Sequence, residues 1–317
     1  MNILQECEGA KTIGISAHIR PDGDAIGSTM ALYLYLKKKM PESRIHLYLE
    51  GIPGGFTHLR YLQEADLTYQ GEDTFDVFFA LDTNAERLGG AEAFFHGARK
   101  KINIDHHISN ASGCGDVNLV IPDASSTAEV LFGVIPKEDL DTDIAMALYT
   151  GIIHDTGVFQ YSNTSPKTME IGAQLIAFGF PFARIIEESF YQKTYLQSQI
   201  MGRALIESIR FMDGKCIVSC IDKKKMDFYG AKPSDLDGIV NQLRNIAGVH
   251  CAIFMYEKEH MEYKVSLRTD EYVDAARVTS FFGGGGHVRA AGCTMRGTMH
   301  DVINNLSAQI ALQLSDS

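Results

Sequence analysis

Short apolar runs, each followed at once by a polar side chain, dominate the first half of the chain. They cover residues 13–17, 75–81 and 101–104, and they lead into His18, Asp82 and Asp105. Nearly continuous apolar runs of this length are typical of parallel strands that are covered on both faces. Because ligands bind at the carboxyl ends of parallel strands, we expect these three side chains to share one edge of a sheet.

Periodicity and capping residues predict the other elements of this half. They are a strand over 44–49, a short helix over 56–62, and helices over 28–39, over 142–153 and from Pro166 onward. Ser126 and Glu129 have the spacing of a capping box at the start of a further helix. Strands that alternate with helices in this way predict an α/β domain with a parallel sheet and helices on both faces.

The pattern changes after residue 208. Hairpins are predicted over 211–221, with a turn at Asp213-Gly214, and over 249–268, and a helix is predicted over 233–246. This order indicates a smaller α/β domain with a mixed sheet. We therefore expect a first domain at 1–190, a helical connector at 191–208 and a second domain at 209–317.

Length and charge narrow the class of protein. The chain has 317 residues, enough for two domains with separate cores, and a formal net charge of -11. That charge opposes binding to long nucleic acid, which depends on Lys and Arg neutralising many phosphates. No apolar run reaches the roughly 20 residues of a bilayer span, and no signal-peptide pattern is present. We expect a soluble, cytoplasmic protein without a membrane partner.

A mixed set of His and Asp residues lies at predicted element ends. The set consists of His18, Asp22, Asp24, Asp82, His106 and Asp155. Such a set suits Mn²⁺, or failing that Mg²⁺ or Fe²⁺. Two alternatives need no metal: Asp22 and Asp24 could cap a helix, and Asp105-His106-His107 alone could be a solvated loop.

A run of four glycines, Gly283 to Gly286, precedes His287 in the second half. Successive glycines expose backbone N–H groups without Cβ atoms in the way, which suits phosphate binding. The alternative is a flexible linker. The chain contains no GxxxxGK[ST] motif, and no GxGxxG follows the first strand, so a P-loop motor and a Rossmann dehydrogenase are both poorly supported.

Taken together, these motifs resemble the DHH/DHHA1 phosphoesterases, within the nanoRNase/pAp-phosphatase (bifunctional oligoribonuclease) branch. The resemblance runs nearly end to end and implies two Mn²⁺ ions. One ion would be held by His18, Asp22 and Asp82, and the other by Asp24, Asp82, His106 and Asp155. It also implies that the first domain is the DHH catalytic domain and the second a substrate-binding DHHA1 domain.

The same resemblance implies roles for residues that bind no metal. His107 would face the substrate phosphate, and Asp105 would orient a neighbouring ligand. The substrate-binding residues would be Arg268, Gly284, Gly285, Gly286 and His287. One position departs from the family, because Val158 stands where Arg often follows Asp-Thr-Gly, and this puts one phosphate contact in doubt.

The expected function is hydrolysis of very short oligonucleotides to mononucleotides, of 3'-phosphoadenosine 5'-phosphate (pAp) to AMP, or of both. The attacking group would be a hydroxide activated by two metal ions. Two alternatives stay open: a phosphodiesterase for cyclic di-AMP or its linear product pApA, and a nucleotide-binding regulator without catalysis. The partner would be a short oligonucleotide or a nucleotide bisphosphate, and a homodimer is left open.

Overall fold

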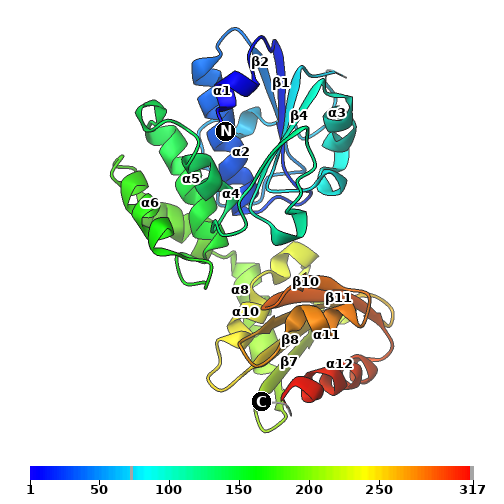
Figure 1. The fold of residues 1–317 in the computed structure, drawn as a ribbon. Coiled ribbons are helices and arrows are strands. Elements are labelled where there is room, and N and C mark those ends of the chain that lie inside the picture. The colour runs from blue at the N-terminus through cyan, green and yellow to red at the C-terminus, as the bar shows by residue number, and fades with distance from the viewer. Residues whose placement is uncertain (72–73, 315–317) are drawn as a thin grey trace. The chain divides into compact units, whose positions relative to one another are not determined.

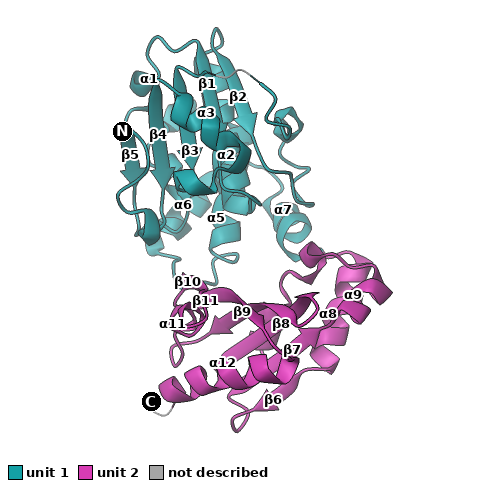
Figure 2. Cartoon of the chain, turned by 90° about the vertical axis from the view of Figure 1, so that its right-hand side faces the viewer, with its two compact units in different colours: residues 1–192 teal, residues 193–317 magenta. Residues whose placement is uncertain are grey.

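The computed structural model describes residues 1–71 and 74–314, which divide into two compact units at 1–192 and 193–317 (Figure 2). Each unit has its own hydrophobic core. No helix in the described ranges is both long enough and apolar enough to cross a bilayer. The predicted boundaries at residues 190 and 208 stay predictions.

The first unit, coloured from blue to green in Figure 1, is built on a parallel sheet in the order β2-β1-β3-β4-β5 (Figure 2). Its strands are β1 Thr12–Ser16, β2 Arg44–Tyr48, β3 Val77–Leu81, β4 Lys100–Asp105 and β5 Val117–Val120. Its helices are α1 Ile3–Glu6, α2 Gly23–Lys39, α3 Glu92–Gly97, α4 Thr127–Phe132, α5 Thr142–Asp155, α6 Pro166–Ile176 and α7 Phe182–Ile186.

Alternate residues of β3 face opposite sides of this sheet. Phe79 packs into the large core shared with α2, α4 and α5, whereas Phe78 packs with Phe94 and Phe95 of α3 on the other side. Both faces are therefore buried, which explains why every residue of β1 and β3 is buried and why β3 is apolar throughout. The predicted parallel sheet with helices on both faces is confirmed.

The second unit contains a mixed sheet in the order β10-β11-β9-β8-β7-β6, in which only the β7–β8 pair is parallel. Its strands are β6 Ile209–Phe211, β7 Cys216–Ile221, β8 Cys251–Glu259, β9 Glu262–Thr269, β10 Gly285–His287 and β11 Ala290–Arg296. Its helices are α8 Tyr195–Ile206, α9 Lys223–Tyr229, α10 Ile239–Arg244, α11 Ala275–Ser280 and α12 Met299–Leu314. The predicted mixed sheet and both hairpins are confirmed.

Two predicted helices differ from the structure. Residues 56–62 form turns that lead into a short 3-10 helix at Leu62–Glu64. The helix predicted over 233–246 is split into a 3-10 turn at Pro233–Leu236 and α10, because Gly238 between them has a φ of 86°. A left-handed residue cannot continue a right-handed helix, so the chain restarts there.

Candidate functional site

The carboxyl ends of three neighbouring strands supply the centre of the site. His18 lies two residues beyond β1, Asp82 follows β3 directly, and Asp105 ends β4 immediately before His106 and His107. Asp82 has a φ of 57°, an uncommon conformation for a residue with a Cβ, and its backbone N–H donates to the Ile104 carbonyl of β4 at 3.0 Å. The backbone is thus turned sharply at the point where the carboxylate leaves the sheet.

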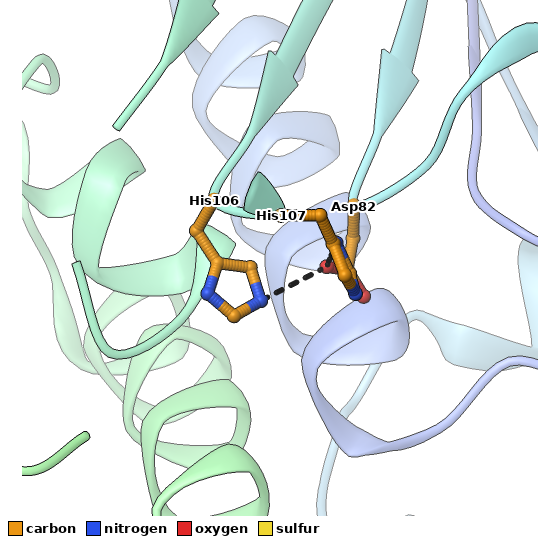
Figure 3. Close-up of side chains that lie close together, drawn as sticks. All are labelled: Asp82, His106 and His107. Carbon is orange, nitrogen blue, oxygen red and sulfur yellow. Dashed lines mark ion pairs between the residues drawn. The ribbon is translucent and has the colours of Figure 1, made fainter. Parts of the chain in front are cut away.

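Asp82 lies between the imidazoles. Its Oδ2 lies 3.5 Å from His18 Nε2. Its Oδ1 lies 3.6 Å from His106 Nε2 and 3.5 Å from His107 Nδ1 (Figure 3). The side chain of Asp82 is only 2% exposed, so this charge depends on these neighbours. The two oxygens of this carboxylate therefore face different imidazoles: Oδ2 faces His18, and Oδ1 faces His106 and His107.

Helices α2 and α5 bring the remaining carboxylates. Asp22 is the N-cap of α2 and lies 3.6 Å from His18 Nε2, while Asp24 is in the first turn of the same helix. Asp155 is the last residue of α5 and lies 3.2 Å from His106 Nε2. The capping role that the sequence suggested for Asp22 is present, since its Oδ1 accepts the N–H groups of Asp24 and Ala25.

Among the residues that the structure describes, three groups of side-chain atoms are close enough to hold a metal ion, with all atoms of each group within 4.8 Å of one another. The groups are His18 with Asp22 and Asp82, Asp24 with His106 and Asp155, and Asp82 with His106 and His107. Every residue of the predicted ligand set thus lies in at least one group. Their roles as ligands stay predictions.

The close packing of carboxylates in the site shifts the pKa values of several of its side chains. Burial and the nearby carboxylates of Asp82 and Asp155 raise the pKa of Asp24 well above its usual value. Burial and the charge of Asp82 do the same to the pKa of Asp155. Burial lowers the pKa of His18, but the Asp22 and Asp82 carboxylates outweigh burial and raise it to about 10. Bound protons thus partly compensate for negative charge that a divalent cation would neutralise.

Helix α4 contributes contacts that the sequence analysis missed. The N–H groups of Thr127 and Ala128 donate to the two carboxylate oxygens of Asp24 at 2.7 and 3.0 Å, and the Thr127 hydroxyl donates to Asp82 at 3.1 Å. Asp24 is fully buried, so these donors fix its orientation. No periodic pattern marks Thr127, because its role depends on where α4 docks.

Glu129 corrects the predicted capping box. Ser126 does cap α4, since its hydroxyl accepts the Glu129 N–H. The Glu129 carboxylate, however, does not return to Ser126; it accepts hydrogen bonds from the Ser125 and Thr168 hydroxyls at 2.7 and 2.8 Å. Only half of the capping box is present, because Glu129 is buried and ties α4 to α6 instead.

The glycines of the run Gly283 to Gly286 do not share one structural role. Gly285 to His287 form the edge strand β10, which pairs with β11, so the linker alternative is wrong for these residues. A Cβ on Gly284 would lie 2.3 Å from the Gly292 carbonyl oxygen, and Gly286 has a φ of 145°. At Gly285 a Cβ would meet no atom within 4 Å. Packing and backbone conformation thus require glycine at Gly284 and Gly286 but not at Gly285.

Known protein families and relatives resemble this chain in both units. The model of the DHH family, N-terminal domain, matches residues 12–152, and that of the DHHA1 domain matches residues 213–315. A Thermus thermophilus protein named bifunctional oligoribonuclease and PAP phosphatase NrnA is 31% identical, with 93% of this chain and 87% of the relative covered. A Bacillus subtilis protein of the same name is 28% identical, with coverage of 90% and 89%.

A solved structure gives the same fold. The crystal structure of an exopolyphosphatase-related protein from Bacteroides fragilis has a TM-score of 0.89 and 25% identity, and the match covers 99% of this chain and 95% of that one. With two family models and a relative above 30% identity over most of both chains, the chain belongs to the DHH/DHHA1 phosphoesterase family, which confirms the predicted hydrolase class.

Proposed function

We propose that this protein is a metal-dependent phosphoesterase that hydrolyses very short oligonucleotides to mononucleotides and pAp to AMP. The names of the Thermus and Bacillus relatives support both substrate classes. The observation that carries the proposal is the placement of Asp82, whose two oxygens face His18 on one side and His106 on the other. A carboxylate in this position suits a bridge between two cations.

The side chains fit two divalent ions, which we assign as Mn²⁺. His18, Asp22 and Asp82 would hold one, and Asp24, Asp82, His106 and Asp155 the other, because imidazole and carboxylate together suit such metals. The raised pKa values of Asp24 and Asp155 are consistent with a site built for added positive charge. When bound, the ions would neutralise phosphate oxygens and supply hydroxide near neutral pH.

His107 would act on the substrate. Its Nδ1 lies 2.8 Å from Asp105 Oδ1, which fixes the ring and directs Nε2 away from Asp105. Asp105 is held in turn by Asn110, whose amide donates to its other oxygen at 2.7 Å. From this position His107 would donate a hydrogen bond to a phosphate oxygen or a proton to the leaving oxygen.

The second unit would bind the rest of the substrate. Arg268 lies on β9, in register with Ala290 of β11, which is itself paired with His287 of β10. We propose that Arg268, His287 and the exposed backbone of Gly284 to Gly286 bind a phosphate group of the nucleotide. A homodimer and a cytoplasmic location stay predictions.

The test is a substrate panel with the purified full-length chain: pAp, pApA, cyclic di-AMP and oligoribonucleotides of two to ten nucleotides, each with Mn²⁺ and after chelation. We expect AMP from pAp and mononucleotides from the shortest oligonucleotides, with rates that fall as the chain lengthens. Hydrolysis of cyclic di-AMP alone would favour the cyclic dinucleotide alternative. Nucleotide binding without hydrolysis would favour a regulator, and activity that persists with metal shown to be absent would contradict the proposal.

A further inference from the structure

The chain turns left-handed two residues after Asp155. Gly157, Val158 and Phe159 have φ values of 56°, 58° and 63°. Val158 is β-branched, and such a residue at positive φ is a genuine outlier. Residues held in unfavourable conformations persist where the surrounding structure fixes them, and they cluster at functional sites.

Hydrogen bonds hold this turn against α5. The Val158 N–H donates to the Ile153 carbonyl at 2.7 Å, and the N–H groups of Gln160 and Tyr161 both donate to the Thr156 carbonyl at 2.9 Å. The Asn163 side chain closes the loop, since its Nδ2 donates to the carbonyls of Asp155 and Ser125 at 3.1 and 2.9 Å. Residues 156–163 are thus folded back onto the end of α5.

The fold-back places the ring of Tyr161 on Gly157. A Cβ on Gly157 would lie 2.4 Å from Tyr161 Cζ and about as close to two further ring carbons, so the ring lies flat against the glycine. The Tyr161 side chain is nevertheless 48% exposed. Gly157 is two residues from Asp155, so their Cα atoms are at most about 7.6 Å apart. One side of an aromatic ring is therefore held on the turn that follows Asp155, while about half of the residue stays exposed.

A polar side chain precedes Tyr161 in the chain. Gln160, its neighbour in the chain, has its amide nitrogen 3.5 Å from the hydroxyl of Tyr191, a half-exposed residue at the end of the π-helical turn Glu187–Tyr191. An amide carries both a donor and acceptors, which is what the edge of a nucleobase requires. The segment thus carries an exposed amide side chain, Gln160, and an exposed aromatic ring, Tyr161, at consecutive positions.

We propose that Tyr161 stacks on the nucleobase of the nucleotide whose phosphate is cleaved, with the Gln160 amide at the edge of that base. The inference rests on the proposed function, because it takes the substrate to be a nucleotide. Stacking on an aromatic side chain tolerates every base, since each base has a π face. Tyr161 would therefore favour nucleotides over other phosphoesters without selecting a sequence.

The kinetic test compares Tyr161→Leu and Tyr161→Phe, using pApA and ribose 3,5-bisphosphate, a phosphate ester that carries no base and no other aromatic ring. Loss of one stacked base typically weakens binding by roughly 10-fold or more. We expect Tyr161→Leu to raise the KM for pApA by about that factor. The kcat/KM for pApA should fall far more than the kcat/KM for the base-free ester. Tyr161→Phe keeps the ring and should therefore retain most of the wild-type kcat/KM for pApA. Phe228→Leu is the control, because Phe228 is an exposed ring on α9. Equal losses on both substrates, or no loss, would overturn the inference.

A binding test separates this inference from the proposed activity. The chain contains no tryptophan, so Tyr161→Trp introduces a single indole reporter. We expect AMP to quench its fluorescence in a saturable way and ribose 5-phosphate to have much less effect, whereas neither should change the signal of a Phe228→Trp control. Quenching by AMP in a protein that hydrolyses no nucleotide would refute the proposed function and leave the stacking site standing. Equal responses to both ligands would refute the stacking site.

Discussion

Asp105 Oδ1 lies 2.8 Å from the imidazole Nδ1 of His107, and the carboxyl group that makes this contact is fully buried. The same oxygen accepts the backbone N–H groups of His106 and His107 at 2.7 and 3.1 Å. The hydrogen bond that Asp105 accepts from His107 raises the pKa of His107 although burial opposes this. One buried carboxylate therefore orients the imidazole and raises its pKa.

Replacing Asp105 with Asn should reduce turnover without removing metal. Asp105 lies in none of the metal-capable groups found among the described residues, but it orients His107. Loss of such an orienting partner typically costs 10- to 100-fold, and we expect a fall of about that size in kcat for pAp. Metal analysis of the same preparation is the control. An Asp105→Asn protein that has lost a metal ion would show that Asp105 acts on the metal centre itself.

Asp82→Ala should lose metal more completely than Asp24→Ala. Asp82 belongs to two of the metal-capable groups, whereas Asp24 belongs to one. Metal content per chain after dialysis, measured by mass spectrometry together with circular dichroism to check folding, distinguishes the variants. Equal residual metal in two folded variants would contradict the bridging role of Asp82.

The glycines of β10 should respond differently to a single added methyl group. Gly285→Ala should fold normally, because its Cβ meets no protein atom. It should still lower kcat/KM for pAp by about 10-fold, because the methyl group would obstruct close approach of a phosphate. Gly286→Ala should lower the unfolding temperature, because its φ is 145° and the Cβ would lie 2.5 Å from the Ala290 carbonyl oxygen.

The unfolding temperature and the kcat/KM for pAp are measured on both variants. The comparison also tests the substrate role of this strand, since a stable Gly285→Ala protein with full activity on pAp would remove Gly285 from the binding site.

Acid should destabilise the first unit partly through Glu129. Burial raises its pKa, but the hydrogen bonds from Ser125 and Thr168 outweigh burial and hold the pKa below the usual 4.5. The ionised carboxylate therefore stabilises the fold above about pH 4.5, and this contribution is lost as the pH falls through the lowered pKa. Glu129→Gln should cost about 1–3 kcal/mol at pH 7, and the difference from the wild type should shrink below pH 4.5.

Urea unfolding at pH 7, 5 and 4 measures this difference. Glu170→Gln on α6 is the matched control, because Glu170 is exposed. A difference between Glu129→Gln and the wild type that stays constant over this pH range would show that the charge of Glu129 does not matter.

The sequence predicted the parts of the fold that depend on local pattern. Apolar runs that end at His18, Asp82 and Asp105 placed these residues at one sheet edge, because strand direction alone brings them together. The helix predicted over 56–62 was wrong because the prediction relied on local pattern alone. The side chains of Phe56 and Leu59 are buried at a helical spacing, but they belong to turns that pack against the core. Burial and helix leave the same pattern in a short segment.

Other features depend on contacts between distant segments and could not be predicted. Thr127 reaches Asp82 only because α4 docks beside β4, and no residue near Thr127 in the sequence marks it. Val158 and Phe159 adopt left-handed conformations that their residue types disfavour. Such conformations are imposed by the surrounding structure, so a propensity argument points away from them.

The acidic and imidazole side chains of the candidate centre come from segments spread between His18 and Asp155 along the chain. They converge only after β1, β3 and β4 have paired and α5, the last of these elements to be synthesised, has packed against α2. A ribosome-bound chain that lacks α5 therefore carries an incomplete centre, whatever its early strands have already formed. Hydrolytic capacity should consequently appear only after Asp155 has been synthesised and α5 has folded, so a shorter nascent chain would not be active.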